Sequence, residues 1–139
     1  MNKKNIADLK KTYKPLLEKI DEIWCDDGWY DIISLAVSEI KRQCGKDIRV
    51  LQIKEKLGRL VIYTNFAEVC DESQAKMFFE IFDAYWKMSA TVCEATGSDG
   101  ATLRYKDGCY KTLCPSSSIL LGYGDVPEGK GLIYFNISI

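Results

Sequence analysis

Two cysteines, Cys93 and Cys114, could contribute to a metal site, because they bracket a glycine-bearing turn and a predicted short hairpin. A structural zinc ion needs four nitrogen or sulfur ligands, and two ligands spaced by two residues can point at one ion from a tight turn. At the positions that would complete each pair, the sequence has Thr96 and Ser117. A neutral hydroxyl is a poor zinc ligand. The segment therefore has the residue spacing of a zinc site but only half of its ligands, and we expect no bound metal.

Residues for other kinds of chemistry are few. The chain has no histidine, which excludes histidine-based triads, Cys–His nucleophile pairs and histidine metal ligands. An enzyme would depend on Cys109 or Cys114 as nucleophile, or on a carboxylate pair such as Glu55 with Asp107. Neither arrangement comes with a base or an oxyanion motif. We therefore expect a protein without catalytic activity and without a cofactor.

The composition is that of a globular protein. The 139 residues are 47% hydrophobic and 28% charged, which fits a single domain over residues 1–139. A net charge of −1 gives no general attraction to nucleic acid or to an anionic membrane. No apolar run is long enough to span a bilayer, and no apolar segment of a signal peptide follows the N-terminal lysines. We expect a cytoplasmic protein whose six cysteines are reduced.

The hydrophobic pattern of the first third predicts two helices. Apolar residues recur at helical spacing over residues 3–24, with a break at residues 12–15 because of Pro15. A second helix is predicted from the turn at Asp27 and Gly28 to a C-terminal cap at Gly45.

The rest of the chain predicts strands around one long helix. Residues 48–56 alternate as the first strand of a β-hairpin, and residues 60–64 form the second strand after a turn at Leu57-Gly58 or Gly58-Arg59. Glu55 is expected at the exposed end of that hairpin. An aromatic helix then starts at Asp71 or Ser73 and keeps its period as far as Cys93. A short hairpin turns at residues 106–108, and residues 131–139 read as a terminal strand. The predicted fold is α+β, with the long helix packed on a small antiparallel sheet.

Several stretches together resemble a family of small phage and prophage-borne proteins. The family pattern contains G-D-G-W, Q-V-K-E-K-[FL]-G-x-L-R-F-Y, T-C-E-x-C-G and G-W-x-x-T-L-C-x-x-H. This chain has DDGW at residues 26–29, QIKEKLGRLVIY at residues 52–63, TVCEATG at residues 91–97 and GCYKTLCPSS at residues 108–117. The resemblance extends from the second predicted helix through the cysteine hairpin.

The resemblance implies a zinc knuckle with four ligands, C-x-x-C and C-x-x-H. Cys93 and Cys114 match two ligand positions, whereas Thr96 and Ser117 occupy the other two. We therefore interpret the hairpin as a degenerate knuckle. Two alternatives stay open: a Cys93–Cys114 disulfide, which a reducing cytosol would oppose, and a site that recruits Cys109 as a third thiolate.

The function expected from these features is binding to another protein. The resemblance to phage proteins suggests an anti-defence inhibitor or a toxin-immunity protein in the cytoplasm of a bacterial host. An acidic and aromatic stretch is the predicted contact surface, and its candidate residues are Asp21, Glu22, Asp26, Asp27, Trp29, Tyr30 and Asp31. The tryptophans there could instead be core residues. The alternative function is nucleic-acid binding through a basic sheet face made of Lys54, Lys56, Arg59, Arg104, Lys106 and Lys111.

Overall fold

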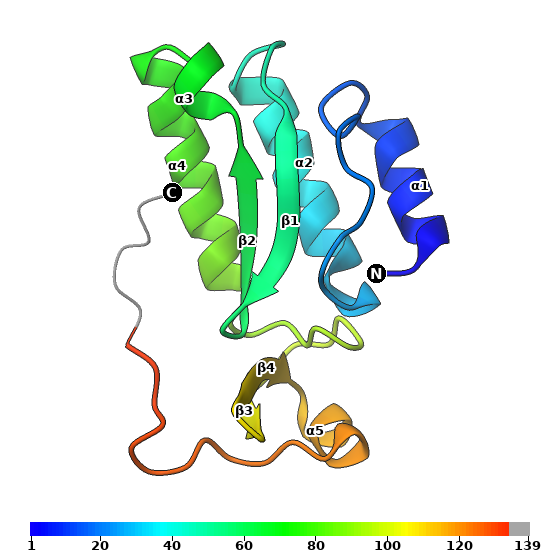
Figure 1. Cartoon of the computed structure of the whole chain (residues 1–139), viewed down its shortest axis with the longest axis vertical. Coiled ribbons are helices and arrows are strands. Elements are labelled where there is room, and N and C mark those ends of the chain that lie inside the picture. Colours follow the sequence, from blue (N-terminus) through cyan, green and yellow to red (C-terminus); the bar gives the residue numbers. More distant parts are fainter. Residues whose placement is uncertain (134–139) are drawn as a thin grey trace.

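The structure, a computed structural model, describes residues 1–133 and has the predicted α+β architecture (Figure 1). Its helices are α1 (Lys3–Thr12), the 3-10 turn η1 (Asp27–Trp29), α2 (Tyr30–Gln43), α3 (Phe66–Val69), α4 (Glu72–Met88) and α5 (Pro115–Leu121). Its strands are β1 (Val50–Lys56), β2 (Arg59–Thr64), β3 (Thr102–Lys106) and β4 (Cys109–Leu113). Within residues 1–133, no helix combines the length and the apolar character needed to cross a bilayer.

The N-terminal helix is shorter than the sequence pattern predicts. It begins where the Asn2 side chain accepts a hydrogen bond from Asn5 N–H, and it ends at Thr12, at the predicted break. The prediction of a second helical segment up to residue 24 is wrong. Proline disfavours helical geometry in the residue before it and has no N–H to donate, so the chain turns after residue 12.

The segment that follows runs along the free edge of β1. Trp24 N–H donates to Ile53 O over 3.0 Å, and Trp24 O accepts from Glu55 N–H at 2.8 Å. Val50 N–H donates to Leu16 O in the same way. These hydrogen bonds satisfy backbone groups that the edge of β1 would otherwise leave unpaired, and they favour the extended path of this segment.

The first hairpin forms as predicted. β1 and β2 pair antiparallel, and Leu57 and Gly58 both have positive φ, 51° and 79°, as a two-residue turn of this twist requires. Glu55 is half-buried, and one carboxylate oxygen accepts a hydrogen bond from Gly58 N–H at 2.6 Å. The carboxylate therefore closes the turn, which explains a polar residue on the apolar face of the strand.

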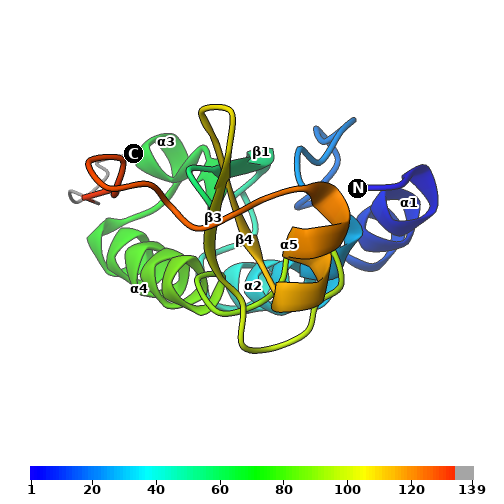
Figure 2. The same cartoon turned by 90° about the horizontal axis from the view of Figure 1, so that it is seen from below.

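Two helices cover one face of this hairpin. α2 ends as predicted before Gly45, whose φ is 91°, and α4 begins with a reciprocal capping box between Asp71 and Gln74. Figures 1 and 2 show α2 and α4 side by side against β1 and β2. The prediction that α4 continues to Cys93 is wrong, because the helix ends at Met88. The largest fully buried side chains of this core are Trp29, Phe78, Leu9, Leu17, Ile20, Ile33, Ile40, Ile48, Ile53 and Leu60.

A second, smaller hairpin lies beyond the β1–β2 turn, with α5 beside it (Figure 1). β3 and β4 pair antiparallel around Asp107 and Gly108, which have φ of 49° and 84°, so this predicted turn is also confirmed. The helix α5, with Pro115 in its first turn, was not predicted. The predicted terminal strand falls mostly outside the described residues, and residues 131–133 form no strand.

Candidate functional site

The four sequence motifs meet where the small hairpin joins the main core. Gly28 packs so closely on the cysteine turn that an added Cβ would lie 2.4 Å from the carbonyl oxygens of Cys93 and Glu94. On the other side, the Thr112 hydroxyl donates to the carbonyl oxygen of Gly58 at 2.6 Å. The glycine of DDGW and the glycine of EKLG are therefore the places where the small hairpin touches the core.

Trp29 is a buried side chain at this junction. Its side chain is 0% exposed, and its indole Nε1–H donates to Val92 O at 2.9 Å. A buried tryptophan normally finds such a partner for its single polar atom. Trp29 is thus a core residue, and its side chain is not available for the contact surface suggested from the sequence.

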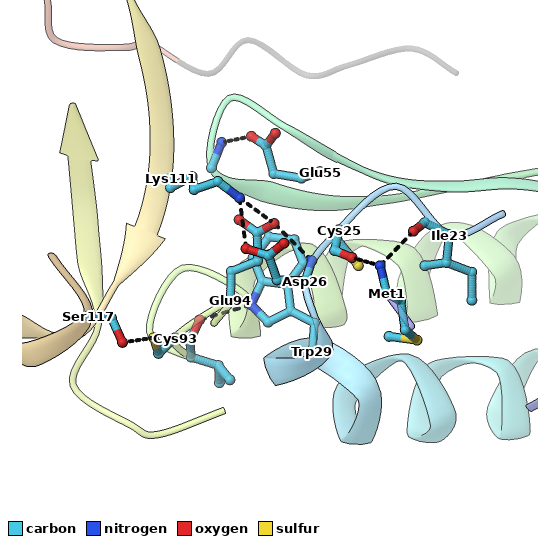
Figure 3. A network of polar contacts seen from close by, with 12 residues as sticks. Met1, Ile23, Cys25, Asp26, Trp29, Glu55, Cys93, Glu94, Lys111 and Ser117 are labelled. Carbon is cyan, nitrogen blue, oxygen red and sulfur yellow. Dashed lines mark hydrogen bonds and ion pairs between the residues drawn. The ribbon is translucent and has the colours of Figure 1, made fainter. Parts of the chain in front are cut away.

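An ion cluster around the buried Glu94 carboxylate crosses the same junction, and the side chains of Lys111 and Asp26 in it are 25% and 49% exposed (Figure 3). Lys111 Nζ lies 3.0 Å from Glu94 Oε1 and 3.0 Å from Asp26 Oδ2. Glu94 Oε1 also accepts a hydrogen bond from Asp26 N–H at 3.1 Å. The cluster links η1, the cysteine turn and β4, which are far apart in the sequence.

Burial dominates the electrostatics of this cluster. Glu94 is 1% exposed, and desolvation raises the pKa of its carboxyl even though Lys111 opposes the shift. Burial by itself lowers the pKa of Lys111, but the charges and hydrogen bonds of Glu94 and Asp26 outweigh it and raise that pKa overall. Among the described residues, Glu94 Oε2 has no hydrogen-bond partner. The lysine is therefore the main group that favours the charged form of this carboxyl, against the effect of burial.

The four positions of the predicted knuckle do come together. Ser117 Oγ lies 3.5 Å from Cys93 Sγ and 3.2 Å from Cys114 Sγ, and Thr96 Oγ1 lies 3.9 Å from Cys114 Sγ. Both cysteines are buried, and both are free thiols. The backbone turns are closed by Gly97 N–H donating to Cys93 O and by Ser118 N–H donating to Cys114 O.

Hydrogen bonds to the sulfur atoms favour their ionised form. Burial opposes ionisation of Cys93, but the Ser117 and Thr96 hydroxyls and the N–H groups of Cys114 and Thr96 lower its pKa overall. At Cys114 the hydroxyls of Ser116, Ser117 and Ser98 and the N–H of Ser117 also lower the thiol pKa. The cluster thus stabilises charge on sulfur without a neighbouring cation.

The donor set does not fit zinc. Tetrahedral zinc needs four nitrogen, sulfur or carboxylate ligands, and this cluster offers two thiols and two hydroxyls. Over residues 1–133, no group of three or more His, Cys, Asp or Glu side chains could hold a metal ion. Cys109 is exposed and pairs with Lys106 at the turn end of the hairpin, whereas Cys114 follows its opposite end. The alternative in which Cys109 supplies a third thiolate is therefore wrong.

The acidic stretch predicted as a contact surface is divided by the fold. Asp27 accepts hydrogen bonds from Asn2 and Asn5, and the N–H of Asn2 makes the largest contribution to lowering its pKa. Tyr30 and Asp31 lie in the first turn of α2, where Tyr30 is half-buried and Asp31 is exposed. These residues and Asp26 are separated from Asp21 and Glu22, which lie exposed beside β1.

An exposed tryptophan stands next to Asp21 and Glu22. Trp24 is 62% exposed although its backbone is fixed to β1, and Leu51 beside it is 48% exposed. They border a shallow pocket of about 430 Å³, whose lining residues are Lys19, Ile20, Asp21, Glu22, Trp24, Leu51, Gln52 and Tyr63. Trp24 lies in the acidic and aromatic stretch predicted as a contact surface, but the alternative that its tryptophans are core residues is wrong for Trp24, because the helix whose apolar stripe it would join does not form.

Most of the cations assigned to a basic sheet face have internal partners. Arg104 pairs with Asp125 at 2.6 Å, and Lys111 belongs to the ion cluster around Glu94. Arg59 lies over the Trp86 ring at 4.2 Å, and Lys54 over the Tyr63 ring at 5.4 Å. These side chains are therefore not arranged as a free basic stripe.

Comparison of the chain with protein-family models, with curated proteins and with solved structures gave no match.

Proposed function

We propose that this chain is a non-catalytic module that binds another protein through the surface around Trp24. The observation that carries this proposal is a large exposed aromatic side chain on a backbone segment that is fixed to a strand. The Trp24 backbone is fixed by two hydrogen bonds to β1, while 62% of the residue is exposed. Fixed aromatic side chains dominate the energetics of many protein interfaces, because they bury a large area at a small cost in conformational entropy.

The surroundings of Trp24 suggest the chemistry of the partner. Leu51 extends the apolar area, and Asp21 and Glu22 place two carboxylates at its border. A partner that presents an apolar side chain flanked by lysine or arginine would complement this surface, which we call the Trp24 surface (Trp24, Leu51, Asp21 and Glu22). The phage-like motifs favour a host defence protein or a toxin as that partner.

The contacts at the motif junction favour a structural role for its charged residues over a catalytic one. Lys111 pairs with both Glu94 and Asp26, and Ser117 Oγ contacts the buried sulfurs of Cys93 and Cys114. These residues hold the small hairpin on the core, and we infer surface recognition as the function.

Affinity capture tests the proposal. Tagged wild-type protein, Trp24→Ala and Leu35→Ala are incubated with bacterial lysate, with and without nuclease treatment, and the bound proteins are identified by mass spectrometry. Leu35 is the matched control, because it is 54% exposed on α2, away from Trp24. Circular dichroism and thermal unfolding establish that the variants are folded.

The proposal predicts one protein that wild type and Leu35→Ala retain and Trp24→Ala loses. If capture depends on intact nucleic acid, the nucleic-acid alternative takes its place. A protein that all three forms retain equally would contradict the assignment of the Trp24 surface.

A further inference from the structure

The thiol cluster has a donor set that suits a different metal from the one implied by the knuckle motif. Two buried sulfur atoms, of Cys93 and Cys114, contact one and the same oxygen, Ser117 Oγ, at 3.5 and 3.2 Å. No third thiol, imidazole or carboxylate among the described residues joins them. Soft thiolates bind copper(I), zinc and iron–sulfur clusters, and two sulfur donors are too few for zinc, so copper(I) is the metal that this donor set suits best.

We propose that Cys93 and Cys114 form a bis-thiolate site for a single copper(I) ion. Each thiol releases its proton when it binds the metal, so the bound form carries two thiolates and one monovalent cation. The hydroxyls of Thr96 and Ser117 stay outside the coordination sphere and support the sulfur atoms by hydrogen bonding.

The neighbouring hydroxyls are suited to support the two sulfurs. Ser116 Oγ lies 3.3 Å from Cys114 Sγ, and Thr96 Oγ1 lies 3.9 Å from the same sulfur atom. Such bonds compensate the net negative charge that remains when two thiolates bind one monovalent cation. The core side of the cluster is closed by the Gly28 contact, and the exposed Thr96, Ser98 and Ser116 lie at its outer side, where an ion can enter.

Hydroxyl groups stand at the two positions where a zinc knuckle has its other ligands. Ser117 occupies the position of a fourth ligand in the motif, and its hydroxyl instead contacts both sulfur atoms. Thr96 takes the corresponding position in the first turn, where its hydroxyl also contacts Ser98 Oγ at 2.9 Å. Replacing two strong ligands by two hydroxyls lowers the coordination number that the cluster can supply, which disfavours zinc and leaves room for a two-coordinate ion.

Competition with a chromophoric chelator tests the proposal. Reduced full-length protein is titrated anaerobically into the copper(I) complex of bicinchoninate, and the loss of colour reports the copper transferred. The variants are Cys93→Ser, Cys114→Ser, Thr96→Ala and, as the matched control for a free thiol, Cys109→Ser. A parallel titration with zinc and a zinc indicator measures the competing metal.

The proposal predicts that wild type withdraws one copper(I) per chain. Cys109→Ser and Thr96→Ala keep this stoichiometry, whereas Cys93→Ser and Cys114→Ser bind more weakly by over about 100-fold, beyond the effect typical of losing a supporting group. Equal copper binding by wild type and the Cys93→Ser and Cys114→Ser variants would overturn it. Tight zinc binding at the same cysteines would also overturn it.

X-ray absorption on the copper-loaded wild type identifies the atoms bound to copper, and it needs no serine variant to fold. Two sulfur neighbours and no nitrogen or third sulfur are the expected coordination. Three sulfur neighbours would contradict the two-cysteine site.

Discussion

Replacing Lys111 by methionine isolates the energetic role of the ion cluster around Glu94. Methionine keeps most of the aliphatic side chain but removes the ammonium group, which lies 3.0 Å from both Glu94 Oε1 and Asp26 Oδ2. Removing one partner of a fully buried ion pair typically costs about 3–5 kcal/mol, because an uncompensated charge stays inside the protein. Since the Lys111 side chain is itself 25% exposed, we expect a loss of about 3 kcal/mol, near the lower end of that range.

The stability lost on replacing Lys111 by methionine should increase with pH. The pKa of folded Glu94 is raised above its ordinary value of 4.5, chiefly by burial, and removing Lys111 removes the main opposing effect. A carboxyl whose folded pKa is raised stabilises the folded state while it is protonated, and this stability is lost as pH rises through the folded pKa. The Lys111→Met penalty should therefore be small at pH about 4.5 and reach its full size at pH about 8.

Urea unfolding of wild type and variant at both pH values measures this penalty. Lys87→Met is the matched control, because Lys87 pairs with Asp83 on the open surface and should cost less than about 0.5 kcal/mol. Adding Glu94→Gln to Lys111→Met removes the buried charge and should recover part of the loss. A Lys111→Met penalty that is the same at both pH values, or that Glu94→Gln does not reduce, would refute the reasoning.

Two further predictions concern stability. Gly28→Ala should cost about 2 kcal/mol or more, because its Cβ would meet backbone oxygens at 2.4 Å; Gly124→Ala, with open space around it, should cost far less in the same urea assay. Asp71→Ala should cost about 1 kcal/mol, because it removes the N-cap of α4 and half of the capping box, and an unchanged unfolding midpoint would argue against that cap.

The parts of the fold that the sequence predicts are those set by local chemistry. Leu57-Gly58 and Asp107-Gly108 are turn signals in their own right, and the Asp71 cap precedes a strong helical period. The errors occur where local pattern and tertiary contacts disagree. Residues 16–24 have apolar spacing that a helix would share, but Pro15 and the free edge of β1 decide their conformation.

The candidate site was predictable in part for the same reason. The spacing implies the two short turns, and the resemblance to the knuckle pattern implies that Cys93, Thr96, Cys114 and Ser117 converge, as they do in the structure. The Glu94–Lys111 contact was not predicted, because it joins residues 17 positions apart that only the tertiary structure brings together. The signal in the sequence was a carboxylate directly after Cys93 and a lysine three residues before Cys114.

The exposure of Trp24 also depended on tertiary structure. As part of a helix its side chain would have faced the core, whereas an extended strand at the edge of β1 turns it to solvent. Of the predicted acidic surface, the proposed contact surface keeps only Asp21 and Glu22, and Trp24 and Leu51 form its apolar part.

The most direct test of the proposed function is the dissociation constant of the purified captured protein for wild type and Trp24→Ala, with Leu35→Ala as control. If Trp24 is the central contact, its removal should cost at least about 2 kcal/mol, which weakens binding by about 30-fold. Leu35→Ala should bind as wild type does. Equal dissociation constants for wild type and Trp24→Ala would show that the partner binds elsewhere and would contradict the account.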